Sequence, residues 1–297
     1  MAARRSTRRA PSFPLAIAGN TTVTGSQGNV HANGDVHGNG NAYLISGNLT
    51  ATGDLSGNTH ANGLVAGGMP AIPVPAIKVA DYTGLATHKL TATGTMLVNS
   101  GAAWVACTGK AALACPVGWS YSGGTWSASG SMPTSGITKS TYWVEGNVSI
   151  KGTGKSSLTQ ISILAEGNLS LQGNGQFKPG NDSGIQFVTN GDFDMQGTVD
   201  ADDSLDFDGQ ILVREQMSIS GNSEFQGRVM VENRSHASNA YNAVTNPHGS
   251  RGANSLSSNN LSGNMRVTYN GSLGGITVTI PGGPDTYTNT IQGWIEQ

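Results

Sequence analysis

The stretch from Tyr142 to Val199 reads YWVEGNVSIKGTGKSSLTQISILAEGNLSLQGNGQFKPGNDSGIQFVTNGDFDMQGTV and repeats one short theme. Each copy has a Gly-Asn or Gly-Asp pair followed by alternating apolar and polar residues, as in Val148-Ser149-Ile150 and Leu169-Ser170-Leu171. Alternation with a period of two is typical of a half-buried β-strand. Because Gly and Asn tolerate positive φ angles, each pair predicts a tight corner between two strands.

The theme recurs after about twenty residues, which is the length of one coil in many solenoid repeats. It also fills residues 17–65, where GNVHANGDVHGNG and SGNLTATGDLSGNTHANG follow the same pattern. One copy cannot bury its apolar face alone, whereas stacked copies build a continuous core. The sequence therefore predicts an all-β protein, a parallel β-solenoid (β-helix) with an inserted irregular subdomain.

Changes in composition predict how the chain is organised. A Pro-rich stretch and a Trp-containing stretch with both cysteines interrupt the repeats. The expected segments are a basic, Pro-containing leader (1–14), first solenoid repeats (15–65), a Pro-rich connector (66–80), the irregular Cys/Trp subdomain (81–141), and second solenoid repeats (142–297) that include a Ser/Asn-rich loop (234–262) and a C-terminal cap.

Composition also excludes some classes of partner. The formal net charge is −2 and charged residues make up 11% of the chain, so we expect no nucleic-acid partner. No apolar stretch approaches the ~20 residues of a membrane span. The leader MAARRSTRRAPSFP lacks the apolar core of a signal peptide. Membrane attachment would therefore need an upstream anchor that this chain does not carry.

Cys107 and Cys115 are the two cysteines of the chain and lie in the segment ACTGKAALACPVGW. Their spacing matches neither a redox CxxC motif nor a zinc site. A local disulfide, suited to an oxidising compartment, is the expected state. Two small buried thiols are the alternative.

The acidic run DADDSLDFDGQILVRE, from Asp200 to Glu215, has two interpretations. Asp206, Asp208 and Glu215 have the spacing of hard oxygen ligands in a calcium loop, with Gly209 at its sharp turn. On an extended strand, however, the carboxylates would form a solvated face, which the alternation with Leu205 and Phe207 favours. A structural calcium ion is thus the alternative, and no other cofactor is expected.

No catalytic residues are predicted, because the chain has neither a GxSxG elbow nor an HExxH motif. The blocks GNVHANGDVHGNG, MPAIPVPAIKVADY, YWVEGNVSIKGTG and ISILAEGNLSLQGNG resemble bacterial type IV pilus-associated proteins of the PilX type. That resemblance implies a Gly-Asn-rich β-solenoid ectodomain behind a membrane-anchored pilin-like helix, which this sequence lacks. It further implies display at a bacterial cell surface and pilus or cell-surface proteins as partners. A weaker similarity to bactofilins implies self-assembly.

The expected function is that of a non-catalytic, surface-displayed or pilus-associated structural or adhesion module. A self-assembling filament subunit and a carbohydrate-active β-helix enzyme are the alternatives, with a second copy and a glycan as their respective partners. The Arg-rich leader and Pro281, Pro284 and Trp294 near the C-terminus are expected to cover the two terminal coils. The isolated chain should then be a monomer or a small oligomer.

Overall fold

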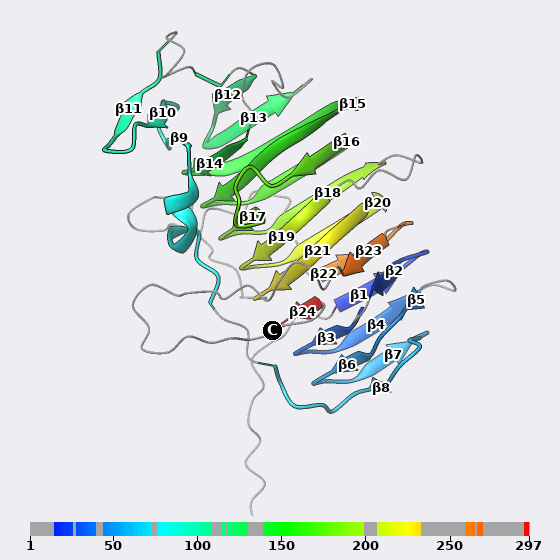
Figure 1. Ribbon diagram of the computed structural model, residues 1–297. Helices are drawn as coiled ribbons and strands as arrows, with labels where there is room; N and C mark the ends of the chain where they lie inside the picture. The colour runs from blue at the N-terminus through cyan, green and yellow to red at the C-terminus, as the bar shows by residue number, and fades with distance from the viewer. Residues whose placement is uncertain are drawn as a thin grey trace, which may run out of the picture.

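The computed structural model describes residues 15–25, 28–39, 44–72, 76–108, 115–116, 118–129, 139–198, 207–232, 259–264, 266–269 and 294–296. These residues form a parallel β-solenoid of about eight turns, so the predicted fold class is confirmed (Figure 1). The one helix among them is the 3-10 helix η1 (Val79–Leu85). No helix in this part of the chain has the length and apolar character needed to cross a membrane.

The strands stack in three parallel ladders, one on each side of the coil. Ladder A runs through β13 (Thr125–Ser129), the start of β15 (Asn147–Ala165), the start of β16 (Leu169–Lys178), β18 (Phe193–Thr198), β20 (Met217–Asn222), β22 (Asn259–Leu261), β1 (Leu15–Ala18), β4 (Val36–Asn39) and β7 (Leu55–Gly57). Ladder B runs through β9 (His88–Leu90), β14 (Ser140–Val144), the end of β15, β17 (Ile185–Thr189), the end of β19 (Phe207–Val213), the end of β21 (Glu224–Val231), β24 (Trp294–Glu296), β3 (Val30–Ala32), β6 (Leu49–Ala51) and β8 (Val65–Ala66). Ladder C runs through the middle of β15, the end of β16, the starts of β19 and β21, β23 (Arg266–Tyr269), β2 (Thr22–Gly25) and β5 (Leu44–Ile45).

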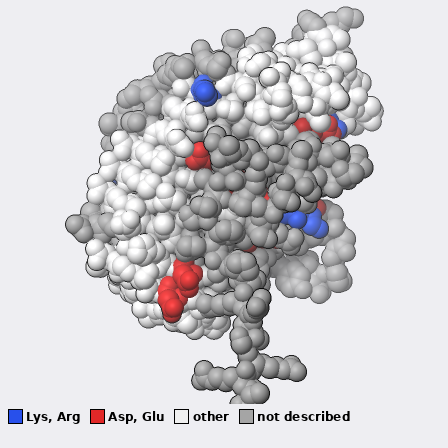
Figure 2. Space-filling model, turned by 180° about the vertical axis from the view of Figure 1, so that it is seen from behind, with Lys and Arg blue, Asp and Glu red and all other residues white. Residues whose placement is uncertain are grey.

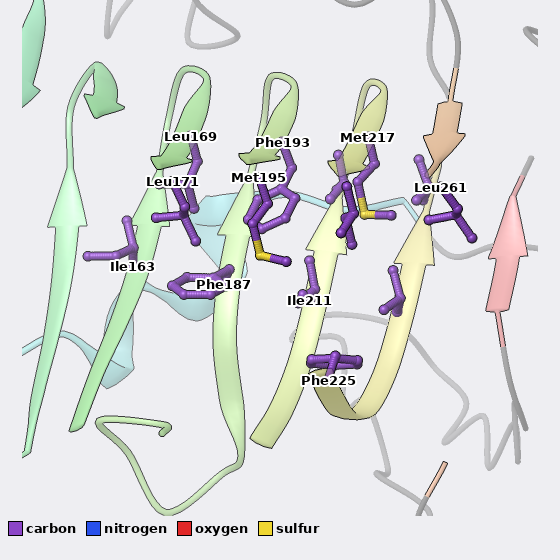
Figure 3. Close-up of a cluster of buried hydrophobic side chains, with 14 of the residues drawn as sticks. Ile163, Leu169, Leu171, Phe187, Phe193, Met195, Ile211, Met217, Phe225 and Leu261 are labelled. Carbon is purple, nitrogen blue, oxygen red and sulfur yellow. The ribbon is translucent and has the colours of Figure 1, made fainter. Parts of the chain in front are cut away.

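Apolar side chains from successive coils stack on one another inside the solenoid. Figure 3 shows this core, in which Leu169, Phe193 and Met217 follow each other along ladder A. Phe187 of ladder B lies 5.7 Å from Phe193, measured between ring centroids. Each of these side chains is at most 1% exposed. The alternating pattern of the sequence therefore correctly identifies the residues that face the core.

Asn and Asp side chains connect the coils at their corners. Each side-chain Oδ1 accepts a hydrogen bond from the backbone N–H of the matching residue in the next coil. These donor–acceptor pairs are Asn168 N–Asn147 Oδ1, Asp192 N–Asn168 Oδ1, Gln216 N–Asp192 Oδ1, Asp54 N–Asp35 Oδ1, Asn48 N–Asn29 Oδ1 and Leu64 N–Asn48 Oδ1, at 2.8–3.0 Å. Partners lie 16 to 24 residues apart in sequence, which agrees with the expected repeat of about twenty.

At several corners the glycine that precedes the Asn or Asp has a different role from the one expected, although Gly146, before Asn147, does have a positive φ angle. Gly167 and Gly191 do not have φ angles in the left-handed region. Instead, a Cβ at Gly191 would overlap Asn168 Oδ1 and lie 2.9 Å from the Asn168 nitrogen. Close stacking of the coils, rather than a positive φ, is therefore what requires glycine here. A second row of glycines, including Gly173 and Gly221, does have positive φ angles (95° and 105°).

The order of coils in the stack differs from their order in the chain. Strands β22 and β23 near the C-terminus pair with β1 and β2, and β24 pairs with β3 (Figure 1). Asn20 donates from Nδ2 to Asn264 Oδ1 at 2.7 Å, across 244 residues of sequence. We call this junction the seam. Trp294–Glu296 therefore lies between coils in the middle of the stack and not over a terminal coil, whereas Pro281 and Pro284 lie outside the described residues.

The described residues of the segment 81–141 lie at one end of the stack. β9 and β13 are in register with β14 and β15, so they belong to the ladders. Antiparallel strands β10 (Met96–Asn99), β11 (Trp104–Ala106) and β12 (Trp119–Ser122) cover them. We call residues 88–129 the cap. The other end of the stack is formed by β7 and β8, which the first repeats supply. The leader 1–14 and most of the Ser/Asn-rich loop lie outside the described residues, although Asn259–Leu261 of that loop forms β22.

Candidate functional site

The Pro-rich connector runs along ladder B from one end of the stack toward the other (Figure 1). We call its described residues, 69–72 and 76–86, the strap. Ile77 and Val79 of the strap are buried against Leu164, Val188 and further apolar side chains of ladder B. This second cluster is separate from the core inside the coils. It consists of Ile77, Val79, Ala86, Leu164, Ile185, Val188, Leu212 and Met230.

Polar side chains at the end of ladder B hold the backbone of the strap. Asn33 accepts a hydrogen bond from Ile72 N–H at 2.8 Å and donates to Ile72 O at 2.6 Å. Glu232 Oε2 accepts from Ile77 N–H at 2.9 Å, and Asn190 Oδ1 accepts from Val79 N–H at 3.0 Å. Hydrogen bonds to a charged group contribute about 1.5–3 kcal/mol each. Residues of three coils therefore fasten the strap at three points.

Glu166 is the buried acid beneath the upper part of the strap. Its carboxylate accepts hydrogen bonds from Trp143 Nε1 at 3.1 Å and from Asn190 Nδ2 at 2.5 Å. Burial raises the pKa of Glu166 to about 7, although these two hydrogen bonds and Lys89 act in the opposite direction. Lys89 itself forms an ion pair with Glu145 at 2.6 Å and lies over the Trp143 ring. Glu166 thus changes charge near neutral pH at a point that supports Asn190 and, through it, the strap.

The sequence interpretation missed the strap, although a signal for it was present. Two strand segments in the middle of ladder B are buried on both faces: Ile161–Ala165 and Ile185–Thr189 have no exposed residue. Such strands read as continuous apolar runs instead of alternating ones. ISILA and IQFVT break the alternation in this way, which indicates that something covers their outer face.

Cys107 and Cys115 are joined by a disulfide in the structure. Cys107 directly follows β11 of the cap, and the bond closes a loop with a sequence separation of 8. Residues 109–114 of that loop lie outside the described residues. The expected pairing is therefore the one present in the structure, whereas its oxidation state in the cell stays a prediction.

We expect reduction of this disulfide to lower the stability of the cap by roughly 2 kcal/mol, because a short loop releases little entropy when it opens. Alkylation of protein taken from its source, followed by mass spectrometry, should find Cys107 and Cys115 protected until a reductant is added. Cys107→Ser supplies the matched unbridged control. Two freely alkylated thiols in the untreated protein would contradict the prediction.

The residues considered for calcium are not brought together along the described chain. Asp206 lies outside the described residues, and for Asp208 the structure describes the backbone of β19 alone. That strand is extended from Phe207 to Val213, so Asp208 and the residue before Glu215 are separated by roughly 17–20 Å at ~3.3 Å per residue. Calcium ligands lie 2.3–2.6 Å from one ion. The described part of the run is thus extended, as the strand interpretation expects, and calcium binding stays a prediction.

Glu215 is instead a buried corner residue that is 3% exposed. Its backbone N–H donates to Gly191 O of the neighbouring coil at 3.3 Å. Among the described residues, no three His, Cys, Asp or Glu side chains are grouped closely enough to hold a metal ion. The described residues of the acidic run thus take part in stacking the coils.

The arrangement of these groups is suited to holding a rigid stack together. Asn33, Asn190, Glu166 and Glu232 all form hydrogen bonds within the molecule, to the strap or to one another. Charged side chains are few and scattered over the described surface in Figure 2. Comparisons of the chain with protein-family models, with curated proteins and with solved structures find no match in any of the three.

Proposed function

We propose that this chain is a non-catalytic structural module that is displayed outside the bacterial cell, on its surface or on a pilus. The strap supports this proposal most directly. Asn33, Asn190 and Glu232 hold its backbone, and an apolar cluster lies beneath it. In a rigid scaffold, buried polar groups form hydrogen bonds to other parts of the same protein. In a binding or catalytic cleft, such groups point toward a ligand.

The disulfide and the surface composition support display outside the cell. Disulfides such as Cys107–Cys115 persist in oxidising compartments and are rare in the cytosol. Ser149, Ser170, Asp194 and Ser218 lie at equivalent, partly exposed positions along ladder A and form a polar row with a single carboxylate. Such a surface suits contacts with cell-surface or pilus proteins or with a glycan, and the resemblance to PilX-type proteins favours the former.

The proposal can be tested on intact source cells. A membrane-impermeant amine reagent should label Lys139, whose side chain is 52% exposed, without lysis. A cytoplasmic protein of the same cells serves as the control and should stay unlabelled until lysis. Labelling that requires lysis would overturn the assignment to the cell surface. Release of reducing ends from a polysaccharide panel by the purified chain would overturn the non-catalytic part.

A further inference from the structure

The stack ends on one side in a coil that no other part of the described chain covers. We call residues 58–69 the end coil. It is tied to the preceding coil by backbone hydrogen bonds from Asn62 N to Ile45 O and from Met69 N to Ala51 O, both at 2.9 Å. Among the described strands, β7 pairs with β4 alone and β8 with β6 alone. The outer edges of β7 and β8 therefore have no neighbouring strand (Figure 1).

Apolar side chains are exposed at this end of the stack. Leu44, Leu64 and Val65 are 44%, 51% and 39% exposed, and they are the three large exposed hydrophobic residues of the described chain. All three lie in the last two coils. In the same region Leu55 is partly buried, whereas Leu49 one coil further in is completely buried. An open strand edge combined with exposed apolar side chains is typical of an interaction surface.

The opposite end of the stack cannot receive another coil in the same way. There β12 pairs antiparallel with β13, and β10 pairs antiparallel with β9. Trp126 Nε1 donates to Thr91 O at 2.9 Å, and the rings of Trp119 and Tyr142 pack at 5.3 Å. The cap therefore closes this end, so a head-to-tail filament of continuous parallel coils is not available to the chain.

Charge favours a second copy as the partner of the end coil. The sequence from Asn58 to Met69, NTHANGLVAGGM, contains no Lys, Arg, Asp or Glu. Two end coils can therefore meet without repulsion between like charges within this segment, and the exposed Asp54, directly before β7, is the acid that adjoins it.

The corner ladder gives a second reason for like ends to meet. Asn29 and Asn48 each accept a hydrogen bond from the next coil, but the following position is Leu64. The side chain of Leu64 has no oxygen with which to accept a hydrogen bond from a further coil. Exposed Leu64 and Val65 instead present an apolar surface at the place where the ladder stops.

We propose that this chain forms a two-fold symmetric dimer in which the end coils of two copies meet. In a contact between like surfaces, each copy's end coil is covered by that of the other copy. The assembly therefore closes at two copies and does not extend into a filament. The two caps then lie at the far ends of the dimer. This proposal goes beyond the proposed function, because it holds whether or not the chain is displayed at a cell surface.

Sedimentation equilibrium of the full chain over a range of concentrations tests the dimer. Wild type should show a monomer–dimer equilibrium. Leu64→Lys places two ammonium groups against each other across the two-fold axis, which should weaken the dimer at least about a hundredfold. Ala102→Lys is the matched control, since Ala102 is an exposed residue of the cap and receives the same charge. Both variants should keep the wild-type circular dichroism spectrum.

A single cysteine near the two-fold axis gives an independent readout. Val65→Cys should form a disulfide-linked dimer under mild oxidation, whereas Ala102→Cys, which keeps the same end coil, should form no covalent dimer under the same conditions. A wild-type chain that sediments as a monomer at its highest soluble concentration would overturn the proposal. Filaments seen by electron microscopy, or a dimer that Leu64→Lys leaves unchanged, would also overturn it. Failure of the dimer would not affect the labelling result on intact cells, so the two proposals can fail separately.

Discussion

Replacing Glu166 by glutamine is expected to raise the free energy of unfolding at pH 8 by about 2 kcal/mol. Burial lifts the pKa of this carboxyl from 4.5 to about 7, so at pH 8 the native state holds a charge at an unfavourable place. A difference of about 2.5 pKa units corresponds to about 3 kcal/mol. The neutral glutamine side chain avoids that cost. The variant loses about 1 kcal/mol because the new amide nitrogen faces the Asn190 amide, which leaves one hydrogen bond unmade.

The pH dependence should follow from the direction of this shift. Between pH 4.5 and 7 the native state binds more protons at Glu166 than the unfolded state does. The contribution of Glu166 to stability is therefore largest in acid, falls as pH rises through this range, and is constant above about pH 7. Subtracting the variant from wild type removes the contributions of other carboxyls, including Asp194, whose pKa burial also raises.

Urea unfolding at pH 5, 6, 7 and 8 measures this difference. The two proteins should differ by at most about 1 kcal/mol at pH 5 and diverge as the pH rises. Glu145→Gln is the matched control, because Glu145 occupies the same corner one coil away and is paired with Lys89. That variant should lose about 1 kcal/mol of stability instead of gaining any. If the free energies of unfolding of wild type and Glu166→Gln change with pH in the same way, Glu166 does not titrate in this range.

Gly191→Ala is expected to lower the free energy of unfolding by about 3 kcal/mol. The new Cβ would overlap Asn168 Oδ1 and lie 2.9 Å from the backbone nitrogen of Asn168. Asn168 Oδ1 is the acceptor for Asp192 N–H, so moving it aside breaks one step of the corner ladder. Overpacking costs about 1–3 kcal/mol and a lost hydrogen bond about 1 kcal/mol more.

Gly84→Ala provides the control for that prediction. No atom lies within 4 Å of a Cβ at Gly84, and its φ angle is not in the left-handed region. Alanine there should leave stability unchanged or raise it by about 0.5 kcal/mol, because it restricts the unfolded chain. Equal denaturation midpoints for the two variants would show that the coils can separate at Gly191 without cost.

Sequence reasoning identified the solenoid because its physical basis is local. Each coil has apolar residues that face the core, such as Val148 and Ile150 in one coil and Leu169 and Leu171 in the next. Their alternation with polar residues is visible within a single repeat. The sequence also identifies the Asn and Asp residues at the corners, because these residue types tolerate the φ angles of a turn. Their side chains in fact bond to the neighbouring coil, and an isolated repeat does not contain that neighbour.

The candidate site was much harder to predict. The acidic run permits both a calcium loop and a strand, and the alternation that favours the strand agrees with β19 at residues 207–213. Glu166, Asn190 and Glu232 do not form a sequence motif. They become a set because the strap bonds to Asn190 and Glu232, and Asn190 in turn bonds to Glu166.

The sequence by itself determined the unit of this protein: a coil of about twenty residues with alternating strands and Gly-Asn or Gly-Asp corners. The tertiary structure decided which coil lies next to which. Every coil presents much the same edge of backbone donors and acceptors, so the repeats do not specify that β22 should pair with β1. The strap decides which coils become neighbours, because it runs back along ladder B. Its apolar side chains and its hydrogen bonds to Asn190 and Glu232 fix it in that path. The second half then returns to the first at the seam, and β1 and β24, the first and last described strands, lie in the middle of the stack.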